Sequence, residues 1–163
     1  MTLYENIAVG AVVPGEADGQ VERAAVWAGA DEIAAKLPRG YETELTRRFA
    51  GGGEHGGVEL SGGEWQKVAL ARGFVRDAAL AILDEPTSAL DADAEYRLFD
   101  RFRELVRGRT ALIISHRFST VRMADQIVVI GHGRVLERGT HAELMQQRGR
   151  YAELFEMQAR RYR

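Results

Sequence analysis

The hydrophobic positions along the chain first predict helices in its N-terminal part. Residues 20–37 carry apolar side chains at a helical spacing, and Pro38 ends that pattern because the residue before a proline avoids the helical conformation. Residues 2–10 predict a short helical or irregular opening, which the proline and glycine of residues 13–15 end. By themselves these residues indicate a small helical unit at the protein surface.

The pattern changes after residue 60, where helical stretches alternate with short apolar runs. Residues 78–83 and 110–114 have the length and composition of fully buried strands. Between them, residues 91–106 predict an amphipathic helix that Gly108 closes. Alternation of strands and helices along the chain predicts an α/β fold with a sheet.

The C-terminal third predicts a hairpin followed by two helices. The predicted order is a strand at 125–130, a strand at 134–138, a helix that begins after Thr140 and an amphipathic helix with a basic end at 151–163. Thr140 and Glu143 have the capping-box spacing, in which each side chain bonds the other residue's backbone N–H. His132 and His141 show no metal-ligand spacing to each other or to the acids, and we expect both at the surface.

The composition narrows the class of protein. With 163 residues, of which 45% are hydrophobic and 28% charged, the chain is typical of a soluble globular domain with a real core. The net charge of −2 argues against a strongly nucleic-acid-binding surface, and we expect no nucleic-acid partner. The chain has no cysteine, which excludes disulfides and thiolate metal sites. Its longest apolar run is 78–83, whereas a membrane-spanning helix needs about 20 residues, so we expect that this chain does not itself cross a membrane.

A serine-glycine turn stands before the first helix of this α/β region. Ser61 and Glu64 have the spacing of a capping box, which predicts a helix start. The free N–H groups and the positive dipole end of a helix start also favour a phosphate, and Gly62 and Gly63 let a ligand approach the backbone closely. The two interpretations are compatible.

Acidic residues follow the first predicted strand. Asp84 and Glu85 stand at its carboxyl end, where open α/β sheets bind ligands. They indicate either a magnesium-nucleotide site or a strand-ending turn with two solvated acids. His116 follows the second strand in the same way, although a lone histidine is more often structural than catalytic. Asp91 is placed to cap the next helix.

Two glycine pairs have the spacing of a phosphate-binding P-loop, but neither completes the motif. Gly10 and Gly15 are followed by Glu16, and Gly52 and Gly57 by Val58. Both lack the lysine and the serine or threonine that reach the phosphates and magnesium. The glycine-rich residues 47–58 are interpreted as a flexible loop.

Taken together, residues 60–91, which include LSGGE and ILDEP, and the SHR sequence at 115–117 strongly resemble the ATP-binding domain of ABC transporters of the exporter type. ENIAVG at 5–10 and LPRGYETEL at 37–45 resemble the helical subdomain of that family. The resemblance implies a partial P-loop NTPase-like core. Residues 1–59 would form the helical subdomain and glycine-rich loop, and residues 60–163 the signature helix, the Walker B half and the C-terminal helices.

The same resemblance implies a role for each matching residue. Asp84 would hold Mg²⁺ through water, Glu85 would polarise the attacking water, and His116 would sense the γ-phosphate. The signature motif, which contacts nucleotide held by the opposite subunit, would comprise Ser61, Gly62, Gly63 and Glu64, and the D-loop at the dimer seam would include Ser88 and Asp91. Exporters more often have glutamine at the position of Glu64, so this chain adds negative charge beside a phosphate site.

The implied function is ATP hydrolysis coupled to export of a substrate across a membrane. ATP and Mg²⁺ would be the cofactors. The partners would be a second ABC ATPase domain, identical or different, and a transmembrane domain that holds the protein at the cytoplasmic face of the cell membrane. Because a P-loop supplies most of the phosphate grip, we expect weak ATP binding and no significant ATPase activity from the isolated chain.

Two alternatives remain at this point. One is a soluble ABC-type ATPase of DNA repair or translation, a class that usually carries long insertions, none of which appears here. The other is a regulatory module without a P-loop that pairs its signature turn with a complete ABC ATPase.

Overall fold

The computed structural model describes residues 1–11, 19–45, 57–76 and 78–161. These residues form two compact units, Met1–Leu112 and Ile113–Arg163, which are described separately. Most of the predicted glycine-rich loop at 47–58 lies outside the described residues, as do Gly15 and Gly52 of the two incomplete P-loop spacings.

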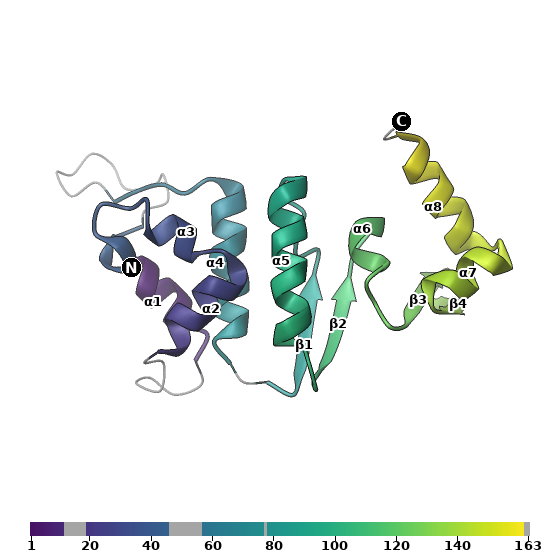
Figure 1. Cartoon of the computed structure of the whole chain (residues 1–163), viewed down its shortest axis with the longest axis horizontal. Helices are drawn as coiled ribbons and strands as arrows, with labels where there is room; N and C mark the ends of the chain where they lie inside the picture. Colours follow the sequence, from purple (N-terminus) through teal and green to yellow (C-terminus); the bar gives the residue numbers. More distant parts are fainter. Residues whose placement is uncertain (12–18, 46–56, 77, 162–163) are drawn as a thin grey trace. The chain divides into compact units, whose positions relative to one another are not determined.

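The first unit begins with short helices (Figure 1). They are α1 (Leu3–Ala8), α2 (Gln20–Ala28), α3 (Asp31–Ala34) and the 3-10 turn η1 (Gly40–Glu42). The short helical opening is therefore confirmed, whereas the prediction of one helix over 20–37 is wrong. Gly29 takes a left-handed φ of 72° and ends α2. The apolar spacing continues past this break because Ile33 and Ala34 of α3 are buried like the apolar residues of α2.

Helix α4 (Gly62–Phe74) packs against α1 and α2 and completes the core of the first unit. Its buried side chains are Val68, Leu70, Ala71 and Phe74. Helix α5 (Ala92–Leu105) contacts α2, and its Phe102 ring lies 6.0 Å from the Phe74 ring, centroid to centroid. The helix predicted over 91–106 is confirmed. The functional division at residues 59 and 60 stays a prediction, since α4 belongs to the same compact unit as the helices before it.

Ion pairs on partly exposed side chains join these helices at their polar edge. Lys67 Nζ of α4 lies 3.1 Å from Glu32 Oε2 of α3, and Arg101 of α5 lies within 3.9 Å of Asp31 and 3.8 Å of Glu32. The hydrogen bond from Lys67 lowers the pKa of Glu32. Arg72 Nε of α4 donates to the Asn6 carbonyl of α1 at 2.8 Å. Lys67 and Arg72 of α4 therefore both connect this helix to the helices before it.

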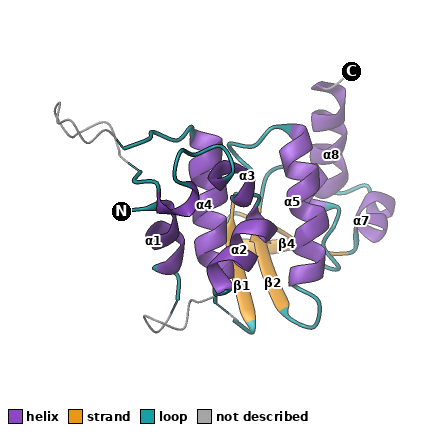
Figure 2. Ribbon diagram, turned by 60° about the vertical axis from the view of Figure 1, so that its left-hand side comes forward, coloured by secondary structure: helices purple, strands orange, loops and turns teal. Residues whose placement is uncertain are grey.

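Strands β1 (Leu80–Asp84) and β2 (Thr110–Ile114) form a two-stranded sheet and lie side by side, with their arrows pointing the same way (Figures 1 and 2). Both predicted strands are present, but the prediction that they are fully buried is wrong for this chain. Alternate side chains are open to solvent: Leu80 is 51%, Ile82 61% and Leu112 52% exposed. A continuous apolar run suits a strand with both faces covered, whereas the described residues cover one face only partly and leave the other exposed.

The second unit holds the predicted hairpin and C-terminal helices. Strands β3 (Ile127–Gly131) and β4 (Arg134–Gly139) pair antiparallel, with a register irregularity between Val129 and Ile130. Helix α7 (His141–Gln147) begins with the complete Thr140–Glu143 capping box, and α8 (Arg150–Arg161) follows it. The short helix α6 (Phe118–Val121) was not predicted. The core of this unit is formed by Ile127, Leu144 and Tyr151.

The two histidines of this unit have different surroundings. His132 is exposed, as predicted, and takes a positive φ of 51° in the hairpin turn. His141 is only partly exposed, since its Nδ1 lies 2.8 Å from the Tyr151 hydroxyl and its ring 5.1 Å from that of Phe155. Both partners come from α8, a contact that the local sequence does not reveal. None of the helices in the described part of the chain is long and apolar enough to span a lipid bilayer.

Candidate nucleotide site

The serine-glycine turn forms the start of α4, with Ser61 as the N-cap. Ser61 Oγ accepts a hydrogen bond from the Glu64 N–H at 3.3 Å, and Glu64 Oε2 accepts from the Ser61 N–H and from the Ser61 hydroxyl, both at 2.8 Å. The capping box predicted from the spacing is therefore confirmed. These bonds to Ser61, its backbone N–H foremost, lower the pKa of Glu64, so the carboxylate is charged at neutral pH.

The two glycines of the turn have different surroundings. A Cβ added at Gly62 would meet no atom within 4 Å, so the backbone of the exposed turn is open to a ligand on that side. A Cβ added at Gly63 would lie 2.9 Å from the Ala89 carbonyl oxygen. Gly63 therefore allows α4 to approach the loop that follows β1.

That loop carries the two acids. Asp84 is exposed at the end of β1, and Glu85 is partly buried. Glu85 has a φ of 46°, in the left-handed region that residues with a side chain seldom adopt. Backbone strain of this kind costs on the order of 1 kcal/mol and tends to occur at functional positions. The sequence placed the acids correctly at the strand end but gave no sign of this conformation.

Gln66 of α4 holds the loop in place through its side-chain amide. Its Nε2 donates to the Glu85 carbonyl at 2.9 Å and to Ser88 Oγ at 3.1 Å, and its Oε1 accepts from the Ala89 N–H at 2.7 Å. The helix that begins at the serine-glycine turn is thus hydrogen-bonded to the loop that carries the two acids. Sequence reasoning missed Gln66, because its partners lie 19 to 23 positions away and no local spacing points to them.

The two residues that are predicted to belong to a D-loop, Ser88 and Asp91, both make contacts within the first unit. Ser88 is bonded to Gln66, and Asp91 Oδ1 accepts from the Ala94 N–H at 2.7 Å, which confirms Asp91 as the N-cap of α5. Both residues are exposed. Their role at a dimer seam stays a prediction.

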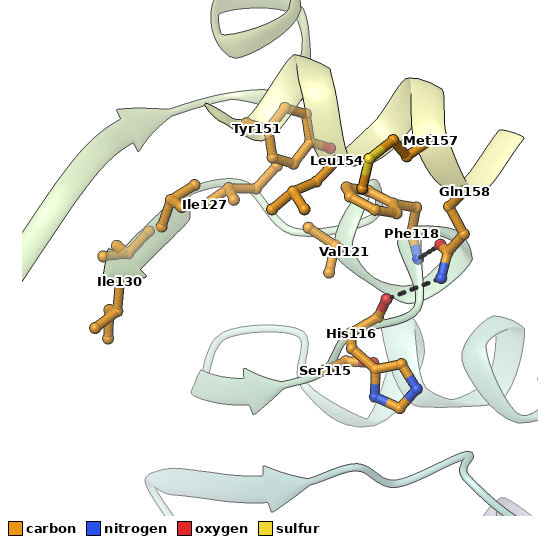
Figure 3. Close-up of a pocket in the computed structure, with 12 residues that line it drawn as sticks. Ser115, His116, Phe118, Val121, Ile127, Ile130, Tyr151, Leu154, Met157 and Gln158 are labelled. Atoms are coloured by element: carbon orange, nitrogen blue, oxygen red, sulfur yellow. Dashed lines mark hydrogen bonds between the residues drawn. The ribbon is translucent and has the colours of Figure 1, made fainter. Parts of the chain in front are cut away.

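His116 belongs to the second unit and follows β2. Its side chain is exposed, and Figure 3 shows the imidazole pointing away from Phe118 and Gln158. Next to it lies a largely apolar cavity of about 550 Å³. Asp84 and Glu85 lie in the first unit, whereas His116 lies in the second and is described separately. Within the first unit, Gly63 and Gln66 bring the helix that begins at Ser61 against the loop that contains Glu85 and Ser88.

The acids fit a magnesium ion that keeps most of its water. No group of three or more histidine, cysteine, aspartate or glutamate residues that could hold a metal occurs within residues 1–11, 19–45, 57–76 and 78–161. Asp84 offers one exposed carboxylate. Mg²⁺ typically binds one or two carboxylates and completes its octahedral shell with waters and nucleotide phosphates, which this arrangement permits.

Comparison with known proteins extends the resemblance. The profile of the ABC transporter family matches residues 1–88. The ATP-dependent lipid A-core flippase of Pseudomonas aeruginosa is 43% identical over 161 residues, covering 96% of this chain and 25% of the relative, and that of Alkalilimnicola ehrlichii is 45% identical over 157 residues with the same coverage.

A solved structure of similar fold is that of a bacterial Atm1-family ABC exporter with ATP bound. It superposes with a TM-score of 0.84 at 38% identity, over 97% of this chain and 26% of the exporter. The present chain thus spans about a quarter of the length of these relatives. The predicted partial ABC ATPase fold is confirmed. With a family match over more than half of its length and this likeness in fold, the chain belongs to the ABC transporter family.

Proposed function

We propose that this chain supplies the signature turn and the Walker B acids of an ATPase domain that couples ATP hydrolysis to export across a membrane. The observation that supports this most directly is the Gln66 amide, which joins α4, the helix of the signature turn, to the Glu85–Ala89 loop. An enzyme of this class needs both elements beside nucleotide. The named relatives are flippases and an exporter, which favours export over the DNA repair or translation alternative.

The acids would act on the nucleotide side of this chain's own domain. The exposed Asp84 carboxylate would hold Mg²⁺ through water, and bound Mg²⁺ would neutralise charge on the β- and γ-phosphates of ATP. Glu85, partly buried and fixed through its carbonyl by Gln66, would accept a hydrogen bond from the attacking water and take its proton. The His116 imidazole would donate a hydrogen bond toward the γ-phosphate.

The signature turn would act on nucleotide held by a second ABC ATPase domain. Ser61, Gly62 and Gly63 begin a helix of 13 residues, whose N-terminal N–H groups and dipole favour a phosphate. The Ser61 hydroxyl now donates to Glu64, so it would have to exchange that acceptor for a phosphate oxygen. Ser88 and Asp91, both exposed, would lie at the seam between the two domains.

The partners would be that second domain and a transmembrane domain, with the assembly at the cytoplasmic face of the cell membrane. The isolated 163-residue chain would bind ATP weakly and turn it over insignificantly, because none of its residues completes a P-loop motif. Robust magnesium-dependent turnover by the pure chain would contradict this part of the proposal.

The first test is the size and location of the native polypeptide. An antibody raised against residues 151–163 is applied to membrane and soluble fractions of the source cell. We expect a membrane-bound band several-fold larger than 18.1 kDa. A soluble band at 18.1 kDa would instead favour the regulatory module that pairs with a complete ABC ATPase.

The catalytic assignment is tested with Glu85→Gln in the complete polypeptide expressed from the native gene. We expect ATP turnover to fall by about 100-fold or more while ATP binding persists, because the amide fills the same space but cannot accept the proton. Glu104→Gln is the matched control, since Glu104 is exposed on α5, outside the proposed site. Equal turnover in the Glu85→Gln and wild-type proteins would refute the role of Glu85.

A further inference from the structure

We propose that Gln158, on the C-terminal helix α8, is a positioning residue for His116. The inference rests on the proposed function, because it concerns how the chain places the histidine that would face the γ-phosphate. It adds a residue 42 positions away from His116, on a helix to which the sequence assigned no part in the site.

One side-chain amide spans the backbone that follows His116. Gln158 Nε2 donates to the His116 carbonyl at 3.2 Å, and the Phe118 N–H donates to Gln158 Oε1, also at 3.2 Å (Figure 3). The planar amide thereby fixes the peptide units on both sides of Arg117. The Arg117 N–H in turn donates to Ser115 Oγ at 3.0 Å, so successive backbone groups of the turn are held.

Aromatic contacts hold the same segment against the same side of α8. Tyr151, Phe155 and Gln158 are spaced by four and three residues and therefore share one helix face. The Phe118 ring meets Phe155 at 5.2 Å and Tyr151 at 5.5 Å between centroids, both edge to face. Such pairs add about 0.5–1.5 kcal/mol each beyond their buried area. Helix α8 thus holds the backbone that follows His116 in two ways, through the aromatic contacts of Phe118 and through the two hydrogen bonds of Gln158.

These contacts matter for His116, whose side chain is exposed. The position of the imidazole depends on the backbone that carries it, and Gln158 holds that backbone on the side that follows His116. A displacement of about 1 Å in a group that acts on a reacting phosphate can reduce the rate by about 100-fold. In a purely structural role, Gln158 would only accept the hydrogen bond from the Phe118 N–H at the start of α6. The structural role and the positioning role predict different results in the following experiments.

The first experiment uses Gln158→Met in the complete polypeptide expressed from the native gene. Methionine keeps the length of the side chain and removes both hydrogen bonds. We expect kcat to fall by about 5–10-fold, with the KM for ATP changed by less than about twofold, because a misplaced histidine affects the reacting state more than binding. Gln147→Met, at an exposed position of α7, is the matched control and should leave both constants unchanged.

A double-mutant comparison separates positioning from stability. In a His116→Ala background, Gln158→Met should cause no further loss of kcat, because its effect passes through the missing imidazole. An equal loss in the two backgrounds would overturn the proposal and leave Gln158 a structural residue. Gln158→Glu keeps the acceptor for the Phe118 N–H but loses the donor to the His116 carbonyl, so its kcat should also fall. Wild-type kcat in Gln158→Glu would likewise overturn the proposal.

Hydrogen exchange gives a readout that does not need ATP turnover. The Phe118 amide should exchange faster in Gln158→Met than in the wild type, and at the wild-type rate in Gln158→Glu and Gln147→Met. An unchanged exchange rate of the Phe118 amide in Gln158→Met would show that Gln158 does not hold this backbone, and would overturn the proposal. If the wild-type polypeptide hydrolyses no ATP, the proposed function fails while this measurement still decides whether Gln158 holds the turn.

Discussion

At the scale of single residues, the Ser61 hydroxyl can donate one hydrogen bond, either to Glu64 or to a bound phosphate. In this structure it donates to Glu64 Oε2 at 2.8 Å. A phosphate that accepts this hydrogen bond must replace the Glu64 carboxylate as the acceptor and must also approach its negative charge. The interpretation of Glu64 as a helix cap is confirmed, and its effect on a bound nucleotide is open to measurement.

We predict that Glu64→Gln strengthens the ATP-dependent pairing of the complete polypeptide with its partner domain, by about threefold to tenfold in the ATP concentration required. The amide still caps α4 but carries no charge, and removing a like charge at about 4 Å is worth about 1 kcal/mol where water screens the pair as in bulk solution. Glu143→Gln is the control, because Glu143 makes the same capping box with Thr140 in α7. Weaker pairing in Glu64→Gln, or an equal gain in Glu143→Gln, would contradict the prediction.

Glu64 also predicts how stability depends on pH. Its pKa is lowered in the folded state, so its contribution to the free energy of unfolding is present above the unfolded pKa of about 4.3 and is lost as the pH falls through the folded pKa. Urea denaturation of the wild type and of Glu64→Gln should therefore show a stability difference at pH 7 that is smaller at pH 3. A difference that stays constant between these pH values would refute the linkage.

At the scale of elements, α4 holds the acidic loop by two devices. Gly63 allows the close approach to the Ala89 carbonyl, and Gln66 makes three hydrogen bonds to the loop. The loop is therefore positioned by the same helix that begins with the signature turn. A displacement of that helix would reach Glu85 through the hydrogen bond on its carbonyl.

We predict that Gln66→Met raises the hydrogen-exchange rate of the Ala89 amide by about fivefold or more and lowers kcat by about tenfold. The methionine removes all three bonds, each worth about 0.5–1.5 kcal/mol net, without leaving a cavity. Gln147→Met again serves as the control. Normal exchange at Ala89 in Gln66→Met would show that the loop holds its conformation without the amide.

Elements whose signals are local could be predicted from the sequence. The capping boxes of Ser61 and Thr140, the cap at Asp91 and the hairpin turn each depend on residues within a few positions, and all are present. The division of the predicted N-terminal helix was missed because Gly29 interrupts the backbone without interrupting the apolar spacing. The contacts of Gln66, Gln158 and His141 were missed because tertiary folding alone brings their partners close.

At the scale of the whole chain, the exposed apolar face of β1 and β2 determines how the isolated chain is expected to behave in solution. Leu80 and Ile82 of β1 and Leu112 of β2 are each more than half exposed, although the two apolar runs that contain them predicted full burial. Exposed apolar strand surface favours association between chains. A longer polypeptide of the size of the relatives has further residues with which to cover it.

We predict opposite effects of Ile82→Thr in the isolated chain and in the complete polypeptide. In the isolated chain it should reduce aggregation, measured by light scattering, because it removes exposed apolar surface. In the complete polypeptide it should lower the melting temperature, because burying a hydroxyl without a partner costs about 1–3 kcal/mol. Val26→Thr, on exposed α2 surface, controls for the substitution and should change neither. The same sign of effect in both proteins would show that the face stays uncovered.

At position 85, the left-handed backbone favours one residue for stability, whereas the proposed chemistry needs another. Glycine adopts a φ of 46° without the penalty that a side chain brings, so the residue that this turn's backbone favours is one that cannot accept a proton. Random variants selected only for resistance to heat would therefore be enriched in glycine at position 85 and would lack the proposed proton acceptor. Selection for turnover would restore the acid and its strain, so the residue found there reports which of the two demands has governed the sequence.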